Sequence, residues 1–269
     1  MNKLFILIVI TLLLVCSCNT SKQIQAFDLI AEKIYVEKID TLNTNENKYN
    51  EDNVIFKPGT VFKYEVSVSK NNKPIFVDSF QKDWTYSYKK DSNSISLNFQ
   101  TEVQSGNPLA KYLPNYNQTS IKYIYSDAYN ATTGVIENVK NLWLHPPRAG
   151  IFSLLELSGF PYVKYPIQLN DEYEWNLLIG DHYSHPDFVN WKGNINTIYK
   201  YKVVSKTKLK TKFGTLKCFV IESTSENKLG IGKTTLYYHR KYGFVKTEFT
   251  SIDGTKFDII LVEKSNKNE

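Results

Sequence analysis

Cysteine is scarce in this sequence, with only three among 269 residues. Cys16 and Cys18 stand at the end of the N-terminal apolar run, where we expect the first to be cleaved away and the second to be modified. Cys218 then has no partner, which excludes a fold held together by disulfides. Because Cys218 shares strand parity with Leu216 and Val220, we expect a small, buried and unreactive thiol.

The number of arginines and the net charge are also low. The only arginines are Arg148 and Arg240, and the formal net charge is +6 at pH 7. Removal of Lys3 with a leader lowers this to +5. The lysines are spread over predicted strands and turns without an apparent basic block, so we predict no nucleic-acid partner. No cofactor is predicted either.

The sequence has one long apolar run, from Leu4 to Val15, interrupted only by Thr11. A membrane-spanning helix needs about 20 apolar residues, so this run is too short. With Lys3 in front of it, the run is typical of a secretory signal that is removed from the mature chain. Residues 1–17 are therefore predicted to be a signal peptide.

The end of this run resembles the bacterial lipobox, because Val15, Cys16 and Ser17 precede Cys18. The pattern predicts acylation of Cys18 and a membrane attachment through N-terminal acyl chains. The alternative is an ordinary signal peptide cut nearby, which would leave Cys18 as a plain thiol. Asn19 stands where aspartate would favour inner-membrane retention. We therefore expect an outer-membrane lipoprotein facing the periplasm, ahead of a place at the cell surface or in the inner membrane.

Residues 18–58 are predicted to form a lipidated polar tether, and residues 59–269 a single β-rich domain. The stretch "DTLNTNENKYNEDN" at 40–53 has almost no apolar side chains to bury. Within the tether, residues 33–39 are expected to add an edge strand.

A period of two begins after Gly59. In "TVFKYEVSVS" at 60–69, Phe62 and Tyr64 share one face and Lys63 and Glu65 the other, as in a half-buried strand. The turn "KNNKP" follows. Similar runs are predicted at 84–88, 95–99, 121–125, 195–203, 216–220, 236–238, 245–251 and 256–263. Asp253-Gly254 predicts a type I′ hairpin turn, so the pairing is expected to be antiparallel.

The segment 148–161, "RAGIFSLLELSGFP", interrupts this pattern. Ile151, Leu154 and Leu155 follow helical spacing, and Gly159 and Pro161 end the segment, which predicts one short amphipathic helix. A single helix must cover the apolar face of the strands. We therefore predict a mainly β fold, a strongly curved antiparallel sheet forming a half-barrel or near-closed barrel, with the helix on its concave side.

Two stretches resemble an uncharacterised family of bacterial (Gram-negative) lipoproteins: "LWLHPPRAGIFSLLELSGFPYVKYPIQLNDEYEW" and "TKFGTLKCFVIESTSENKLGIGKTTLYYHRKYGFVKTEFTSIDGTKFDIILVE". Together they cover roughly residues 141–263. From residue 195 on, the pattern is similar to the unclosed β-barrel of the periplasmic lipoprotein carriers LolA and LolB. The resemblance implies a concave, aromatic-lined sheet and carries no established activity.

Catalytic signals are lacking. There is no G-x-S-x-G nucleophile elbow, and "LGIGKTT" at 229–235 has Asn227 where a phosphate-binding loop needs its first glycine. The stretch "GDHYSHPD" at 180–187 offers a weak metal-ligand set, Asp181, His182, His185 and Asp187. Without a helix to make the histidines converge, a polar loop is the alternative explanation. We predict no catalytic residues.

Aromatic residues make up 14% of the chain. They suit either a core without disulfides or a pocket for an amphipathic ligand. The predicted function is a binding module for an apolar or amphipathic molecule, such as a lipid, on the concave face. The alternatives are an envelope assembly subunit that binds another protein and, third, a metal-dependent hydrolase. The predicted ligand-binding residues are Trp143, Phe152, Leu155, Trp175 and Trp191.

Overall fold

The computed structural model describes residues 27–30, 34–37, 53–106 and 118–267. The predicted signal peptide and Cys18 lie outside these ranges, so their processing stays a prediction. Strands β1 (Phe27–Ile30) and β2 (Ile34–Glu37) pair with each other in a sheet of their own. The strand expected at 33–39 therefore exists as β2, although it does not join the main sheet. Within the described ranges, no helix combines the length and apolar character needed to span a bilayer.

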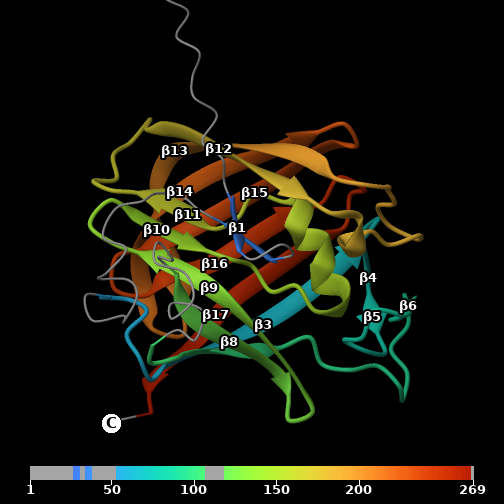
Figure 1. The fold of residues 1–269 in the computed structure, drawn as a ribbon. Helices are drawn as coiled ribbons and strands as arrows, with labels where there is room; N and C mark the ends of the chain where they lie inside the picture. Colours follow the sequence, from blue (N-terminus) through green and yellow to red (C-terminus); the bar gives the residue numbers. More distant parts are fainter. Residues whose placement is uncertain (1–26, 31–33, 38–52, 107–117, 268–269) are drawn as a thin grey trace, which may run out of the picture.

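One 13-stranded antiparallel sheet forms most of the protein (Figure 1). A short separate pair joins β5 (Phe76–Val77) and β6 (Tyr86–Ser87), where a longer strand at 84–88 was predicted. The strands of the main sheet are β3 (Thr60–Lys70), β4 (Lys73–Pro74), β7 (Phe99–Val103), β8 (Thr119–Ser126), β9 (Tyr129–Glu137), β10 (Asn141–Leu144), β11 (Tyr162–Lys164), β12 (Glu172–Ile179), β13 (Ile195–Thr211), β14 (Gly214–Asn227), β15 (Gly230–His239), β16 (Gly243–Thr250) and β17 (Lys256–Asn266).

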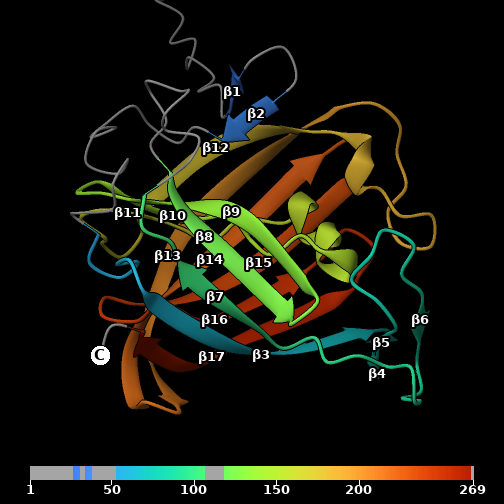
Figure 2. The same cartoon turned by 60° about the horizontal axis from the view of Figure 1, so that its bottom comes forward.

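The strand order is β11-β10-β9-β8-β7-β3-β17-β16-β15-β14-β13-β12, with β4 on β3. Figure 2 shows how strongly this sheet curves. Its edges, β11 and β12, are neighbours in the chain but share no backbone ladder, so the sheet is not closed into a barrel. Side chains span the opening, since the Tyr173 hydroxyl donates to the Tyr162 carbonyl at 2.8 Å. The predicted fold class is confirmed.

The turns confirm most of the predicted hairpins. Asn71 and Asn72 have φ of 53° and 58° and connect β3 to β4, as the type I′ geometry requires. Gly243 has φ of 76° at the start of β16. The hairpin at residues 251–255 differs from the prediction, because only Gly254 has positive φ and the Ser251 amide donates to the Thr255 carbonyl across a longer turn. It is therefore not a type I′ turn.

The packed body begins before the predicted boundary at residue 59. Ile55 and Phe56 are only 2% and 1% exposed. The Asn53 amide also donates to the Thr119 hydroxyl at 2.9 Å. Burial of these two apolar residues and the Asn53 hydrogen bond place this end of the polar stretch against the sheet.

The predicted helix is a 3-10 helix, η3 (Gly150–Leu157), inside the curved sheet. Seven of its eight residues are buried, so it is not amphipathic in its surroundings. Gly159 lets the following chain approach the sheet, because a Cβ there would lie 2.2 Å from the Ser223 hydroxyl. The helix lies on the concave side of the sheet, where the sequence pattern placed it (Figure 2).

Tyrosine hydroxyls satisfy the backbone of this buried, irregular segment. Buried carbonyls outside regular ladders need donors, and tyrosine supplies one at the end of an apolar ring. The Tyr123 hydroxyl donates to the carbonyl of residue 145 at 2.7 Å, Tyr199 to that of residue 156 at 3.0 Å, and Tyr201 to that of residue 160 at 2.9 Å. The richness in tyrosine is therefore partly a hydrogen-bonding requirement of the core.

Cys218 is expected to react slowly with thiol reagents in the folded protein. It is 1% exposed, and burial raises its pKa to about 11. Because the thiolate is the nucleophile, both features suppress modification at neutral pH. Alkylation followed by mass spectrometry should label Cys218 only after denaturant is added, and rapid labelling without denaturant would contradict the described packing.

Candidate functional site

The five predicted ligand-binding side chains lie in the core. Trp143, Phe152 and Leu155 are fully buried, and Trp175 and Trp191 are at most 6% exposed. Trp143 and Trp175 pack edge to face with ring centroids 5.9 Å apart. None of the five lines the pocket described below, because η3 and the aromatic side chains occupy the concave space.

The predicted metal-ligand residues do not converge. Asp181 and His182 belong to the short 3-10 helix η4 (Asp181–Tyr183), and the Asp181 carboxylate accepts from the Gly193 amide at 2.8 Å. His185 instead stacks on Trp84, with ring centroids 4.3 Å apart. In the part of the chain that the structure describes, no three His, Cys, Asp or Glu side chains are placed to hold a metal ion.

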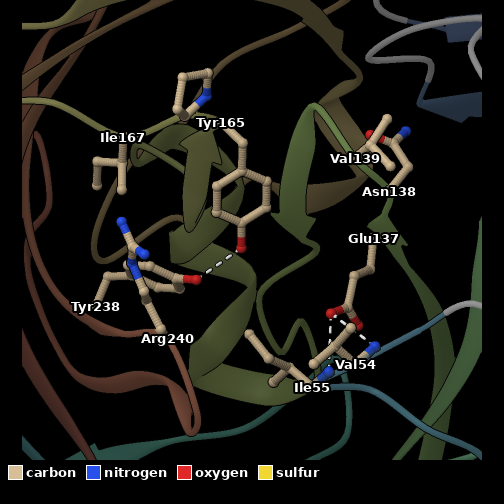
Figure 3. Close-up of a pocket in the computed structure, with 10 residues that line it drawn as sticks. Val54, Ile55, Glu137, Asn138, Val139, Tyr165, Ile167, Tyr238 and Arg240 are labelled. Carbon is tan, nitrogen blue, oxygen red and sulfur yellow. Dashed lines mark hydrogen bonds between the residues drawn. The ribbon is translucent and has the colours of Figure 1, made fainter.

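A pocket of about 380 Å³ lies elsewhere, where several strands begin or end (Figure 3). It is bounded by the segment before β3, the end of β9 and the β9–β10 turn, the β11–β12 connection, and the end of β15. Its lining residues are Val54, Ile55, Glu137, Asn138, Val139, Tyr165, Pro166, Ile167, Tyr238 and Arg240. The volume falls within the usual range for small-molecule sites.

Glu137 forms one wall of this pocket and holds the N-terminal segment in place. Its carboxylate accepts the amides of Val54, Ile55 and Phe56 at 3.0, 2.8 and 2.8 Å. Burial raises the pKa of Glu137, and these three bonds together with the positive charge of Lys264 oppose that shift. Figure 3 shows the carboxylate directed at the amides of Val54 and Ile55, so its negative charge is partly compensated within the protein.

Two phenols face each other on the opposite wall. The Tyr165 and Tyr238 hydroxyls are hydrogen-bonded at 2.7 Å. Burial is the main cause that raises the pKa of both side chains above the ordinary value for tyrosine. Both are therefore protonated at neutral pH, and whichever donates to the other, one hydroxyl hydrogen remains for a ligand.

Arg240 supplies a positive charge beside Tyr238 (Figure 3). It is exposed and forms no ion pair with any described carboxylate. Around the pocket, Val54 and Val139 are 69% and 74% exposed, although both are apolar. The pocket therefore combines apolar walls and rim with a small polar group, which is the arrangement that orients an amphipathic molecule.

Sequence reasoning missed this pocket, although some of its parts were visible. Arg240 is one of only two arginines in the sequence. The role of Glu137 could not be predicted, because its hydrogen-bond partners lie more than 80 residues away in the chain. An acidic residue at the end of an apolar strand, "GVIE", was the only available indication of a buried carboxylate.

Comparison with known proteins leaves the family open. No family model matches the chain, and no curated protein matches it. Among solved structures, a protein described as a lipoprotein from Parabacteroides distasonis is 14% identical over 80% of this chain and 100% of its own, with a TM-score of 0.42. A protein described as exported, with a YmcC-like fold, from Bacteroides fragilis is 11% identical over 78% and 97%, with a TM-score of 0.38. The hypothetical lipoprotein YmcC from Escherichia coli is 8% identical over 86% and 100%, with a TM-score of 0.37. At these identities and TM-scores, the likenesses assign neither a family nor a function to this chain.

Proposed function

We propose that this protein is an acyl-anchored envelope lipoprotein that binds one apolar or amphipathic molecule in the pocket between Glu137 and Tyr238. The observation that carries the proposal is the combination of apolar walls with the Tyr165–Tyr238 hydroxyls and with Arg240, which has no ion pair among the residues that the structure describes. The apolar part of the ligand contacts Val54, Val139 and neighbouring side chains, and its polar or anionic end faces the phenols and the guanidinium. The membrane anchor at Cys18 and the periplasmic location belong to the same proposal.

Native mass spectrometry of the purified protein tests this function. A co-purifying small molecule that is released by organic solvent and identified as a lipid or another amphipathic compound supports it. A ligand-free mass together with a specific crosslinked envelope protein would favour the assembly alternative. Bound zinc that is lost in His182→Ala would favour the metal-dependent alternative.

Replacing Arg240 by alanine is expected to weaken binding of a dansyl-labelled fatty acid by about 10-fold or more. A hydrogen bond to a charged group contributes about 1.5–3 kcal/mol, which corresponds to this factor. The measurement is a fluorescence titration of the folded variant. Lys90→Ala, which removes an exposed cation outside the pocket, is the matched control. Equal affinities of the two variants would place the fatty-acid head group elsewhere.

A further inference from the structure

The far ends of β13 and β14 form a two-stranded ribbon that extends past its neighbours (Figure 2). Strand β12 pairs with β13 only as far as Lys202, and β15 pairs with β14 only from Phe219 on. Between them, residues 207–218 pair only with each other and turn at Lys212 and Phe213. The sequence pattern predicts strands at 195–203 and 216–220, which leaves the lysines between them outside any predicted strand.

The structure places these lysines on one surface. Lys206, Lys208 and Lys210 alternate along β13, and Lys217 lies directly opposite Lys208. With Lys212 at the turn, five exposed lysines share the ribbon, and we call them the lysine ribbon. Residues 203–221 contain no Asp or Glu. None of the five lysines forms an ion pair with a carboxylate among the described residues.

This arrangement costs stability. Like charges directly opposite each other on neighbouring strands are unfavourable, and Lys208 faces Lys217 in this way. The other face of the ribbon is covered, because Leu216 and Cys218 are buried. At the tip, Phe213 stacks on Tyr242 with ring centroids 4.5 Å apart. The lysines are therefore held outward on a ribbon packed against the protein, and an external anion would relieve their repulsion.

We propose that the lysine ribbon docks on a lipid surface that carries anionic phosphate groups. Lysine acts as a compact point charge suited to such a surface. Successive lysines on one face of a strand are about 7 Å apart, so they present a row of charges. The ribbon offers no arginine fork and no free aromatic ring for stacking a base, since Phe213 is paired with Tyr242 and Phe219 is buried under Lys206. These features favour a bilayer over a nucleic acid.

The ribbon also lies at the same end of the sheet as the start of the packed body. Tyr242 stacks on the ribbon tip, and a Cβ at the next residue, Gly243, would lie 3.1 Å from Ile55. Residue 53 is where the segment leading back to Cys18 enters the folded body. With the membrane anchor at Cys18 proposed above, the chain that leads back to the anchor therefore leaves the folded body on the side of the lysine ribbon.

Amine footprinting of the full chain tests the docking without any substitution. The protein is bound through its N-terminal region to vesicles of phosphatidylcholine, or of phosphatidylcholine with 30% phosphatidylglycerol, and treated with an acetylating reagent before mass spectrometry. We expect acetylation of the lysine ribbon to be about fivefold slower or more on the anionic vesicles, because each lysine near such a surface contributes about that factor. High salt should reverse the effect, since it screens surface charge.

Lys90 is the internal control in the same sample. It is exposed and follows β6, which Figures 1 and 2 place on the opposite side of the molecule from the ribbon. Equal acetylation of the ribbon on both vesicles, or equal slowing of Lys90, would overturn the proposal. Protection by duplex DNA in place of vesicles would overturn it in favour of a nucleic-acid partner. A quadruple variant, K206Q/K208Q/K210Q/K217Q, is checked for folding by circular dichroism. In this variant, Lys212 should be acetylated at the same rate on both kinds of vesicle.

Discussion

Glu137→Ala is expected to lower the free energy of unfolding by about 3–5 kcal/mol. The variant removes the acceptor of the amides of Val54, Ile55 and Phe56. Each buried donor left without a partner costs about 1–3 kcal/mol, and Val54 is exposed enough for water to replace part of its bond. Urea denaturation followed by circular dichroism measures the change. Because Ile55 and Phe56 should detach locally first, hydrogen exchange in residues 53–58 is expected to rise even under native conditions.

Glu65→Ala is the matched control, because this glutamate is exposed on β3 and has no hydrogen bond to the described residues 53–59 before that strand. It should change the free energy of unfolding by less than about 0.5 kcal/mol. If both variants were equally stable, the carboxylate of Glu137 would not hold the segment before β3. The pocket would then lack the fixed wall on which ligand binding depends.

The pH dependence of stability has a defined sign at Glu137. Burial raises its pKa above the ordinary 4.5. Between 4.5 and the raised pKa, the folded chain keeps a proton that the unfolded chain has lost, so the free energy of unfolding falls as pH increases through this window. Glu137→Gln cannot titrate. The free energy of unfolding of the wild type, minus that of Glu137→Gln, should therefore decrease as the pH rises above 4.5. A difference that stays constant over this range would contradict the raised pKa of Glu137.

Tyr201→Phe is expected to destabilise the protein by about 2–4 kcal/mol. The Tyr201 hydroxyl donates to the Phe160 carbonyl and accepts from the Trp175 indole at 3.0 Å. Removing one oxygen leaves both buried partners unsatisfied, and each costs about 1–3 kcal/mol. The ring itself remains, so the loss reports on the hydrogen bonds and not on a large cavity. Thermal and urea unfolding of the purified variant provide the measurement.

Tyr88→Phe is the corresponding control, since Tyr88 is 41% exposed and water can replace any bond of its hydroxyl. It should be close to wild type in stability. Loss of similar size in both variants would mean that tyrosine hydroxyls do not fix the 145–160 segment. In that case the aromatic richness of the core would be a matter of packing alone.

The strand pattern could be predicted because it depends on neighbours in sequence. In β3, inward Phe62 and Tyr64 alternate with outward Lys63 and Glu65, as their spacing indicated. The Asn71-Asn72 turn follows from the φ that asparagine tolerates. The ends of strands were harder to predict, because β13 and β14 continue through a polar stretch that is stabilised by their pairing with each other. Local hydrophobicity does not record such pairing.

The candidate pocket depended on groups brought together from distant positions. Glu137 meets Val54 and Ile55 across more than 80 residues, and Tyr165 meets Tyr238 across 73. No spacing rule connects such positions. The aromatic residues predicted to bind a ligand became core for a related reason. The sequence placed Trp143 and Phe152 on the inner side, but only the three-dimensional position of η3 shows that this space is filled.

The amino-acid sequence by itself determined a mainly β chain with antiparallel hairpins, one short helical segment and no disulfide framework, because alternation, turn residues and cysteine number are local or compositional properties. Tertiary structure decided that the helix lies inside the sheet, that Glu137 holds the N-terminal segment, and that five lysines line one ribbon. Each of these depends on how far the sheet curves and which strands end together. That geometry results from the summed packing of the whole core, so it is not encoded in any single stretch of residues.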